Sequence, residues 1–274
     1  TYTTDENGTA SGMFSLEGVG YNMSQVDGHT IVLHDSLSAR IACGVIGNVP
    51  STSVGHFPGY QGSFDPQGYV VVVQNEMTNA CGVSDTTLTL HYMLWNVEAG
   101  SGGLHIHSGT SCDNAGGHDY VIDGRIDPWT TTWESTSTTA YGSFVVSNTG
   151  KDIVDVQDRT IVIHDMGSVK AACGVLDATH LEEPIYAGCS APTATSLGSY
   201  PSYDGALSPE GVVVVTDDGS SLKLTYHITG LEASVSGGLH VHAGMSCETH
   251  DDVGGHYWDA TVGGDPWNTT YTTD

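Results

Sequence analysis

The sequence predicts an all-β protein made of tandem modules, each an antiparallel β-barrel or sandwich with Greek-key connections. Short runs of β-branched or alternating residues are bounded by Gly, Asp, Asn and Pro, and 36 glycines punctuate the chain. No segment shows a long helical period. The clearest predicted strands, in chain order, are residues 69–73, 88–92, 142–146, 160–164 and 212–215.

An internal repeat with a long period is the second observation that predicts this fold. GLHIHSGTSC at 103–112 returns as GLHVHAGMSC at 238–247, and a Gly-Gly-His follows each copy, ending at His118 and His256. The Ile-Val-x-His-Asp and Ala-Cys-Gly-Val segments that contain His34 and Cys43 also return, as do the Asp-Pro-Trp segments. The offset is 130 residues from His34 to His164 and 138 from His118 to His256. A period of this length indicates tandem domains and excludes a short-period solenoid.

The order of the repeated segments predicts how the modules are divided along the chain. Residues 60–178 contain one complete module and 179–204 form a linker. Residues 205–274 supply the N-terminal half of a second module, and residues 1–50 supply a C-terminal half that would complete such a module. Thr1–Asp5 is repeated letter for letter at 270–274, so we hypothesise that the sequence is one period of a longer array. The alternative is chance similarity in a Thr-rich sequence.

The amino-acid composition indicates which cellular environment and which classes of partner suit the protein. Six Lys and Arg against 32 Asp and Glu give a formal charge of −26, which disfavours nucleic acids and anionic membranes. The sequence has no run of about 20 apolar residues, so insertion into a membrane is not expected. Six cysteines fit disulfides in an oxidising compartment, and three Asn-x-Ser/Thr triplets, at Asn7, Asn22 and Asn268, are candidate glycosylation sites. These features predict an extracellular or cell-surface protein.

The repeated histidines form a metal-ligand pattern. Side chains at i and i+2 share one face of a strand, so His105 with His107, and His240 with His242, each present two imidazoles to one ion. Imidazole suits copper and zinc alike, and all-nitrogen, roughly square coordination favours Cu(II). The aspartates Asp123, Asp127 and Asp265 are candidates to orient ligand rings, although the two in Asp-Pro-Trp are also typical turn residues.

With these motifs the chain resembles the copper/zinc superoxide dismutases, and more closely their secreted copper-only repeat relatives. The shared order is a His-x-His strand, a cysteine, a Gly-Gly-His loop, a strand ending in His and an Ala-Cys-Gly-Val segment, all within residues 103–176. The resemblance covers most of both modules. It implies that His105, His107, His118 and His164 are four copper ligands. His240, His242 and His256 would be three more, joined by His34 of this chain or by its equivalent in a following period.

The resemblance also implies disulfides and basic residues beside the metal. Cys112 should pair with Cys173, and Cys247 with Cys43 or its equivalent; Cys81 and Cys189 are then the remaining pair. The family places an arginine three residues before the last cysteine, where it guides superoxide. Arg40 occupies that position in one copy and Lys170 replaces it in the other.

One departure from the family pattern bears on the metal. The stretch between His118 and Gly142 has no histidine, so the conventional zinc site is expected to be absent. His250 has no counterpart in the first copy and is interpreted as a surface residue.

The predicted function is therefore that of an extracellular copper-only protein that disproportionates superoxide to oxygen and hydrogen peroxide. A second hypothesis is that the modules build an extracellular fibre or wall layer in which neighbouring copies of the chain are the partners and copper is secondary or lost. A third is copper storage, which predicts tight binding without turnover.

Overall fold

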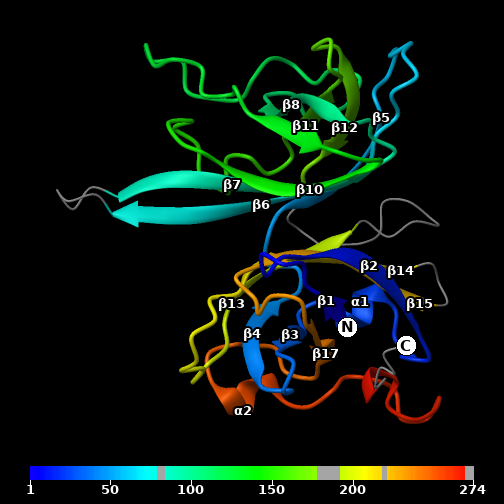
Figure 1. Cartoon of the computed structure of the whole chain (residues 1–274). Helices are drawn as coiled ribbons and strands as arrows, with labels where there is room; N and C mark the ends of the chain where they lie inside the picture. The colour runs from blue at the N-terminus through cyan, green and yellow to red at the C-terminus, as the bar shows by residue number, and fades with distance from the viewer. Residues whose placement is uncertain (79–83, 178–191, 218–220, 269–274) are drawn as a thin grey trace. The chain divides into compact units, whose positions relative to one another are not determined.

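The computed structural model describes residues 1–78, 84–177, 192–217 and 221–268, and the chain divides into two compact units (Figure 1). Unit 1 combines residues 1–48 with 180–274, and unit 2 is residues 49–179. Strands make up 46% of the chain and helices 4%. The prediction of an all-β protein with tandem barrel or sandwich modules is confirmed.

Unit 2 is an eight-stranded antiparallel sheet that curls into a nearly closed barrel. Its strand order is β10-β7-β6-β5-β12-β11-β8-β9. β7 and β8 follow each other in sequence but have four strands between them in the sheet, a crossover of the kind that Greek-key folds use. The strands are β5 (Ser51–His56), β6 (Gln67–Thr78), β7 (Ser84–Trp95), β8 (Gly100–His107), β9 (Thr132–Ser135), β10 (Thr139–Val146), β11 (Thr160–His164) and β12 (Lys170–Val175).

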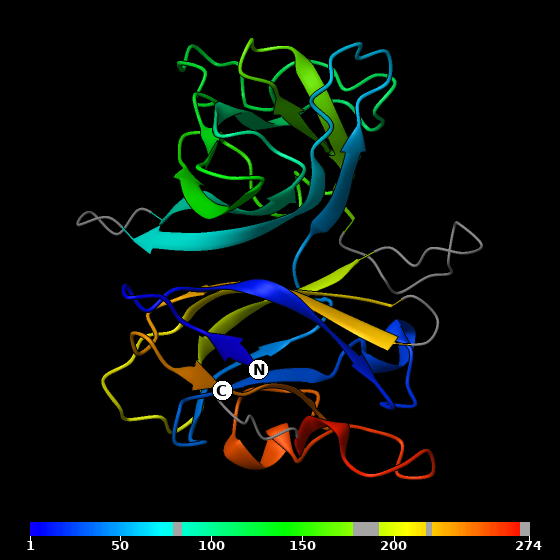
Figure 2. The same ribbon diagram turned by 45° about the vertical axis from the view of Figure 1, so that its right-hand side comes forward.

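Unit 1 contains a seven-stranded sheet in the order β17-β3-β4-β13-β14-β15-β2 and a two-stranded sheet of β1 and β16. The larger sheet folds over so that β2, β14 and β15 face β3, β4 and β17 across a shared core (Figure 2). The strands are β1 (Tyr2–Thr3), β2 (Ala10–Glu17), β3 (Thr30–His34), β4 (Arg40–Val45), β13 (Thr193–Ser199), β14 (Glu210–Asp217), β15 (Ser221–Thr229), β16 (Ser236–Gly237) and β17 (Leu239–His242). The short helices are α1 (Met23–Val26), α2 (His250–Val253) and the 3₁₀ turn η1 (Pro266–Asn268).

The two units have the same sheet order, but the chain enters it at different points. Read from β8, unit 2 runs β8-β11-β12-β5-β6-β7-β10; read from β17, unit 1 runs β17-β3-β4-β13-β14-β15-β2. Each strand matches its repeat counterpart, for example β3 with β11 and β14 with β6. Unit 1 is therefore a circularly permuted copy of unit 2. In this structure, residues 1–48 of the same chain fold back to complete it.

The predicted module boundaries require two corrections. Residues 179–204 were expected to be a linker, yet their described part includes β13, which pairs with both β4 and β14. The complete module was expected to begin at residue 60, but β5 already belongs to its sheet, paired with β6 and β12. Both strands have few large apolar residues, because they are rich in Ser, Thr and Gly, and only long-range pairing identifies them as strands.

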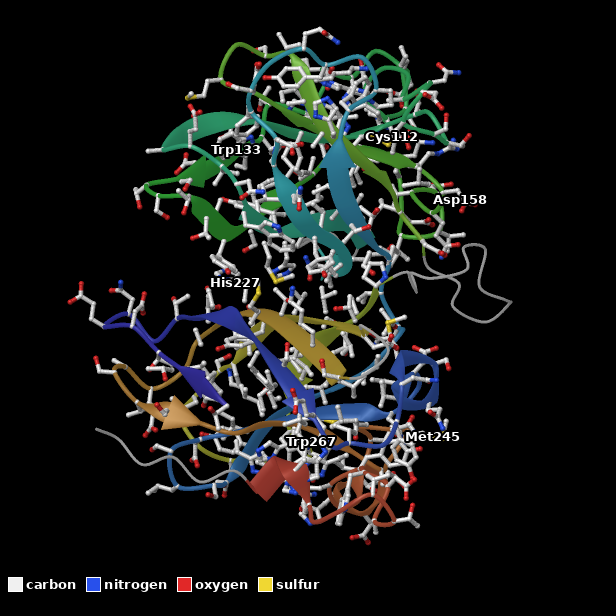
Figure 3. The ribbon with its side chains drawn as sticks, turned by 90° about the vertical axis from the view of Figure 1, so that its right-hand side faces the viewer. Cys112, Trp133, Asp158, His227, Met245 and Trp267 are labelled. Carbon is white, nitrogen blue, oxygen red and sulfur yellow. A yellow bond between two sulfur atoms is a disulfide. The ribbon has the colours of Figure 1, made fainter. Side chains whose placement is uncertain are left out.

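Alternation in the strands separates the core from the opposite face of the barrel wall. In unit 2, Leu104 and Ile106 of β8 and Ile161 and Ile163 of β11 are fully buried in the main core. Trp133 is buried in the same cluster, and Trp267 is buried in the main core of unit 1 (Figure 3). The residues between these core positions must point to the other side of the wall.

Candidate metal centres

The metal-ligand histidines alternate with the core residues and share the outer face of the barrel wall. His105 lies between Leu104 and Ile106 in sequence, and His107 follows Ile106. β8 pairs with β11 so that Val162 lies opposite His105. His164 ends β11, two residues beyond Val162, where the pairing with β12 shifts register. The strand period of two thus brings three imidazoles from β8 and β11 onto one surface.

In unit 2 the four predicted ligands converge. One nitrogen from each of His105, His107, His118 and His164 lies within 4.8 Å of all the others. Nitrogens bound to one ion at about 2.0 Å are at most about 4 Å apart, so a slight contraction is sufficient to close the site. His118 reaches the cluster from the loop after β8, where it forms an isolated β-bridge with His107.

Hydrogen bonds on the outer side of each ring determine which nitrogen faces the centre. His107 Nδ1 lies 3.0 Å from Gly116 O and His164 Nδ1 lies 3.1 Å from Ser168 O. His105 is reversed, with its Nε2 3.0 Å from Thr131 O. A carbonyl only accepts, so each of these nitrogens carries the ring hydrogen and the opposite nitrogen presents a lone pair.

The inward nitrogens have the character of ligand atoms. Within the described residues, His105 Nδ1, His107 Nε2 and His164 Nε2 are buried without a hydrogen-bond partner. A buried polar atom with no partner is costly and needs an explanation such as an ion. Three of them aimed at one point fit a bound metal.

Unit 1 repeats the arrangement with ligands from both of its chain segments. Nitrogens of His34, His240, His242 and His256 also lie within 4.8 Å of one another. His242 Nδ1 bonds Gly254 O at 3.0 Å and His34 Nδ1 bonds Ser38 O at 3.2 Å, matching unit 2. The inward atoms His34 Nε2, His240 Nδ1 and His242 Nε2 are again buried and have no partner in the described part of the chain.

The Asp-Pro-Trp aspartates fill both roles that the sequence left open. Asp127 Oδ2 accepts a hydrogen bond from His118 Nδ1 at 2.8 Å, and its Oδ1 accepts one from Trp129 N at 3.0 Å. Asp265 does the same for His256, at 2.7 Å, and for the backbone of Trp267, at 2.9 Å. Each carboxylate therefore orients the third ligand and shapes the turn. The third aspartate, Asp123, pairs instead with Arg125.

The surroundings of the two His-x-His pairs favour the neutral form of these four rings. Burial, then the charge of neighbouring imidazoles, lowers the pKa of His105 to about 3. Burial also lowers the pKa of His107 to about 4, with a contribution from the charge of Lys170. In unit 1, burial and nearby histidines lower the pKa of His240 to about 2, and burial and Arg40 lower that of His242 to about 3. Neutral imidazole is the form that binds metal.

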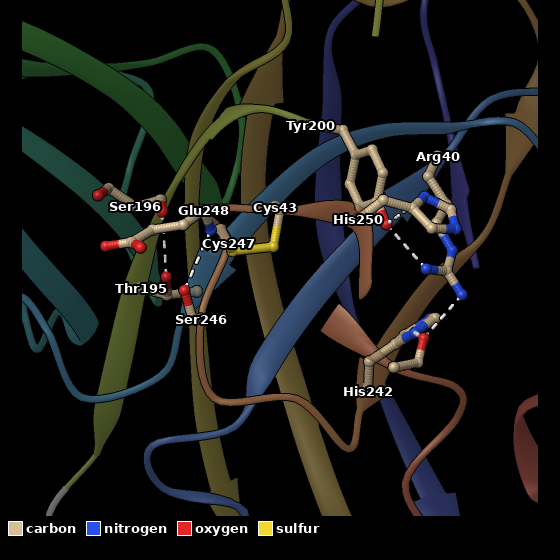
Figure 4. The surroundings of a disulfide bond; sticks show 11 residues. Arg40, Cys43, Thr195, Ser196, Tyr200, His242, Ser246, Cys247, Glu248 and His250 are labelled. Carbon is tan, nitrogen blue, oxygen red and sulfur yellow. Dashed lines mark hydrogen bonds between the residues drawn. A yellow bond between two sulfur atoms is a disulfide. The ribbon is translucent and has the colours of Figure 1, made fainter. Parts of the chain in front are cut away.

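Two disulfides tie the metal loops to the barrel walls, as predicted. Cys112 pairs with Cys173 and Cys247 pairs with Cys43, with Cα atoms 5.9 and 6.0 Å apart. Figure 4 shows the second bond, which joins β4 to the loop after β17. Cys81 and Cys189 lie outside the described residues.

The basic residues bind the same carbonyl groups as the ligands. Lys170 Nζ donates to Gly116 O at 2.9 Å, the carbonyl that also accepts from His107. Arg40 donates to Gly254 O at 2.8 Å, the carbonyl that accepts from His242, and to the Tyr200 hydroxyl at 2.8 Å (Figure 4). Arg40 and Lys170 are therefore one carbonyl away from a ligand in each unit.

Other predicted site residues have definite places. Asn7 and Asn22 are exposed, and Asn22 also caps α1 through its side chain; the Asn268 side chain lies outside the described residues. His250 is not in the cluster but bonds Tyr200.

One arrangement behind the ligands is common to both units but was not predicted from the sequence. Trp133 Nε1 donates to His164 O at 3.0 Å, and the Tyr2 hydroxyl donates to His34 O at 2.8 Å. Different aromatic residues thus support the fourth ligand of each unit, and only the shared partner shows that they are equivalent.

Comparison of the chain with models of known protein families and with curated proteins found no match. Among the described residues, no helix has the length and apolar character needed to cross a bilayer.

Proposed function

We propose that each unit binds one copper ion through its four histidines and that the chain disproportionates superoxide. The observation that carries the proposal is the convergence, in both units, of one nitrogen from each of four imidazole rings. The outer nitrogens of all four rings in unit 2, and of His34, His242 and His256 in unit 1, are already hydrogen-bonded. An all-imidazole donor set of this kind suits copper. When bound, copper would supply the one-electron chemistry that oxidises one superoxide to oxygen and reduces the next to hydrogen peroxide.

The residues of the chain would bind the metal ion and orient the ligand rings. The carbonyls of Gly116 and Ser168 fix the tautomers of two rings in unit 2, and Asp127 fixes a third. His118 and His256 are partly exposed, with 26% and 19% of their side-chain surface accessible, so the centres are open on that side. An anion can therefore approach the face of the site that His118 or His256 borders.

Charge works against an anionic substrate except near the basic residues. Unit 1 carries two Lys and Arg against 18 Asp and Glu, and unit 2 carries four against 14. Arg40 and Lys170 are the local positive charges beside the ligands, and both are close enough to affect the pKa of neighbouring histidines. Since salt screens long-range repulsion more than contacts at the site, the superoxide rate should rise with ionic strength.

The test is metal analysis and electron paramagnetic resonance on the copper-loaded chain, coupled to a superoxide assay. The proposal expects about two coppers per chain, a nitrogen-coupled Cu(II) spectrum and turnover. His56→Ala is a matched control, because His56 is an exposed histidine that bonds Asp65 outside both clusters. Copper binding without turnover would contradict the catalytic role and favour copper storage. Binding of zinc in preference to copper would contradict the metal assignment.

A further inference from the structure

Unit 1 is assembled from two segments that are far apart in the sequence. Residues 1–48 contribute His34, Arg40 and Cys43, and the second segment contributes three histidines and Cys247. In unit 2 the equivalent residues all lie between Gly100 and Val175 on one continuous stretch. Each segment of unit 1 therefore holds only part of a metal centre and half of its disulfide.

The two segments share one core. The main hydrophobic cluster of unit 1 has 21 buried residues, ten from residues 1–48 and eleven from the second segment. Tyr2, Ile31 and Leu33 on one side meet Val213, Leu224 and Leu239 on the other. Neither segment can bury its apolar face alone, so each requires a copy of the other.

One strand position in unit 1 has two candidate occupants in the sequence. In unit 2 the chain runs from Trp129 directly into β9, where Trp133 pairs with Gly102. In unit 1 the equivalent partner, Gly237, pairs with Tyr2 of β1. Counting on from Trp267, however, the residue that matches Trp133 is Tyr271, within a pentapeptide identical to Thr1–Asp5. The five residues at 270–274 are thus identical to the first five of residues 1–48.

We propose that residues 1–48 of a second copy of this chain complete unit 1, joining copies head to tail. The match between residues 270–274 and Thr1–Asp5 is a similarity of sequence between the two segments. Such an exchange keeps every contact of the unit, so it costs only the advantage of closing within one chain, which falls as protein concentration rises. Each joint would then contain a metal centre with His34 from one copy and three histidines from its neighbour, closed by an intermolecular Cys43–Cys247 bond.

The disulfide makes the exchange measurable on the unmodified chain, with or without metal. Equal amounts of ¹⁴N- and ¹⁵N-labelled chain are refolded together at high concentration under oxidising conditions, and disulfide-linked peptides are identified by mass spectrometry. The proposal expects up to about half of the Cys43–Cys247 pairs to carry one label from each chain. The Cys112–Cys173 pair lies within unit 2 and should remain unmixed, which controls for disulfide scrambling.

A second readout covers assembly size. In a Cys81→Ser/Cys189→Ser background, the non-reducing gel should show a ladder of covalent multimers that reduction collapses to a single chain. Adding Cys112→Ser and Cys173→Ser should leave the ladder, whereas adding Cys43→Ser and Cys247→Ser should remove it. Unmixed labels in both disulfides, together with a single non-reduced band, would overturn the proposal.

Discussion

The two units place the same metal-ligand cluster beside different chemistry. In unit 2 the residue after the third ligand is Asp119, which is 5% exposed and lies 3.6 Å from both Lys151 Nζ and Arg159 Nε. In unit 1 the same position is Tyr257, whose ring stacks on Tyr21 at 4.4 Å and on His29 at 3.8 Å. An ion cluster and an aromatic stack thus occupy equivalent positions.

The backbone around these positions is the same in both units. Trp129 Nε1 donates to Asp119 O, and Trp267 Nε1 donates to Tyr257 O, each at 2.8 Å. The carbonyls of Arg159 and His29, which occupy equivalent positions, likewise accept hydrogen bonds from Leu176 N and Ile46 N, each at 2.8 Å. The ligand geometry therefore depends on these backbone bonds and on the disulfides, while the neighbouring side chains differ between the two units.

The largest expected effect is a loss of stability of both metal-free units in acid. Unit 1 should lose stability over the wider pH range. Its His240 and His242 have folded pKa values of about 2 and 3, against about 3 and 4 for His105 and His107. Because these values lie below the unfolded value of about 6.5, the unfolded state binds more protons as pH falls below that value. Stability is therefore full above about pH 6.5 and is lost as pH falls toward the folded pKa values, by at most about 1.4 kcal/mol per pH unit per histidine.

Hydrogen exchange of the metal-free chain between pH 7 and pH 4, after correction for the intrinsic exchange rate, resolves the two units in one experiment. We expect protection in β3 and β17 to fall at least as steeply as in β8 and β11. Protection that is independent of pH in both units would show that the rings are not buried in neutral form.

Removal of one ligand should empty one centre and leave the other. His164→Ala deletes the fourth ligand of unit 2, and His34→Ala deletes that of unit 1. We expect affinity at the altered site to fall by more than about 100-fold, beyond the usual effect of losing an orienting partner. Competition titration with a copper chelator measures it, and equal weakening of both sites by either variant would argue against independent centres.

The orienting carboxylates should have smaller effects of unequal size. Asp127→Asn and Asp265→Asn keep an oxygen for the turn but lose the negative charge toward His118 and His256. Copper affinity should fall about 10- to 100-fold, and more for Asp265, whose side chain is 15% exposed against 41% for Asp127. The same titration tests both, and an unchanged affinity would assign these residues to the turn alone.

Asp119→Asn should destabilise unit 2 by about 2 kcal/mol, since it leaves Lys151 and Arg159 without their buried counter-charge. The value is below that of a fully buried pair because both cations are partly exposed. Tyr257→Phe is the matched change in unit 1 and should have no salt-dependent effect. Urea unfolding at low and high salt distinguishes them, and a salt-independent loss in Asp119→Asn would mean that packing, not charge, is involved.

Tyr2→Phe should have the smallest effect. It removes one hydrogen bond to His34 O and keeps the ring, so unit 1 should lose about 1 kcal/mol. Unit 2, in which Trp133 has this role, is the internal control. If Tyr2→Phe lowered the thermal stability of unit 2 and not that of unit 1, the equivalence of Tyr2 and Trp133 would be contradicted.

Much of the fold and the centre could be read from local patterns. The His-x-His pairs predicted two imidazoles of each centre, because strand alternation acts between residues two apart and the repeat supplied the pattern twice. Alternating β-branched runs predicted the strands for the same reason. The remaining ligands and the two disulfides were implied by the family resemblance.

The contacts between segments that are distant in sequence could not be predicted in this way. The pairing of β13 with β4 and the hydrogen bonds of Tyr2 and Trp133 to the carbonyl of the fourth ligand depend on backbone groups distant in sequence. Such groups are alike in every residue, so no side-chain pattern records them. The candidate metal-binding side chains can therefore be identified from the sequence, whereas the long-range backbone hydrogen bonds that bring their strands together appear only in the folded chain.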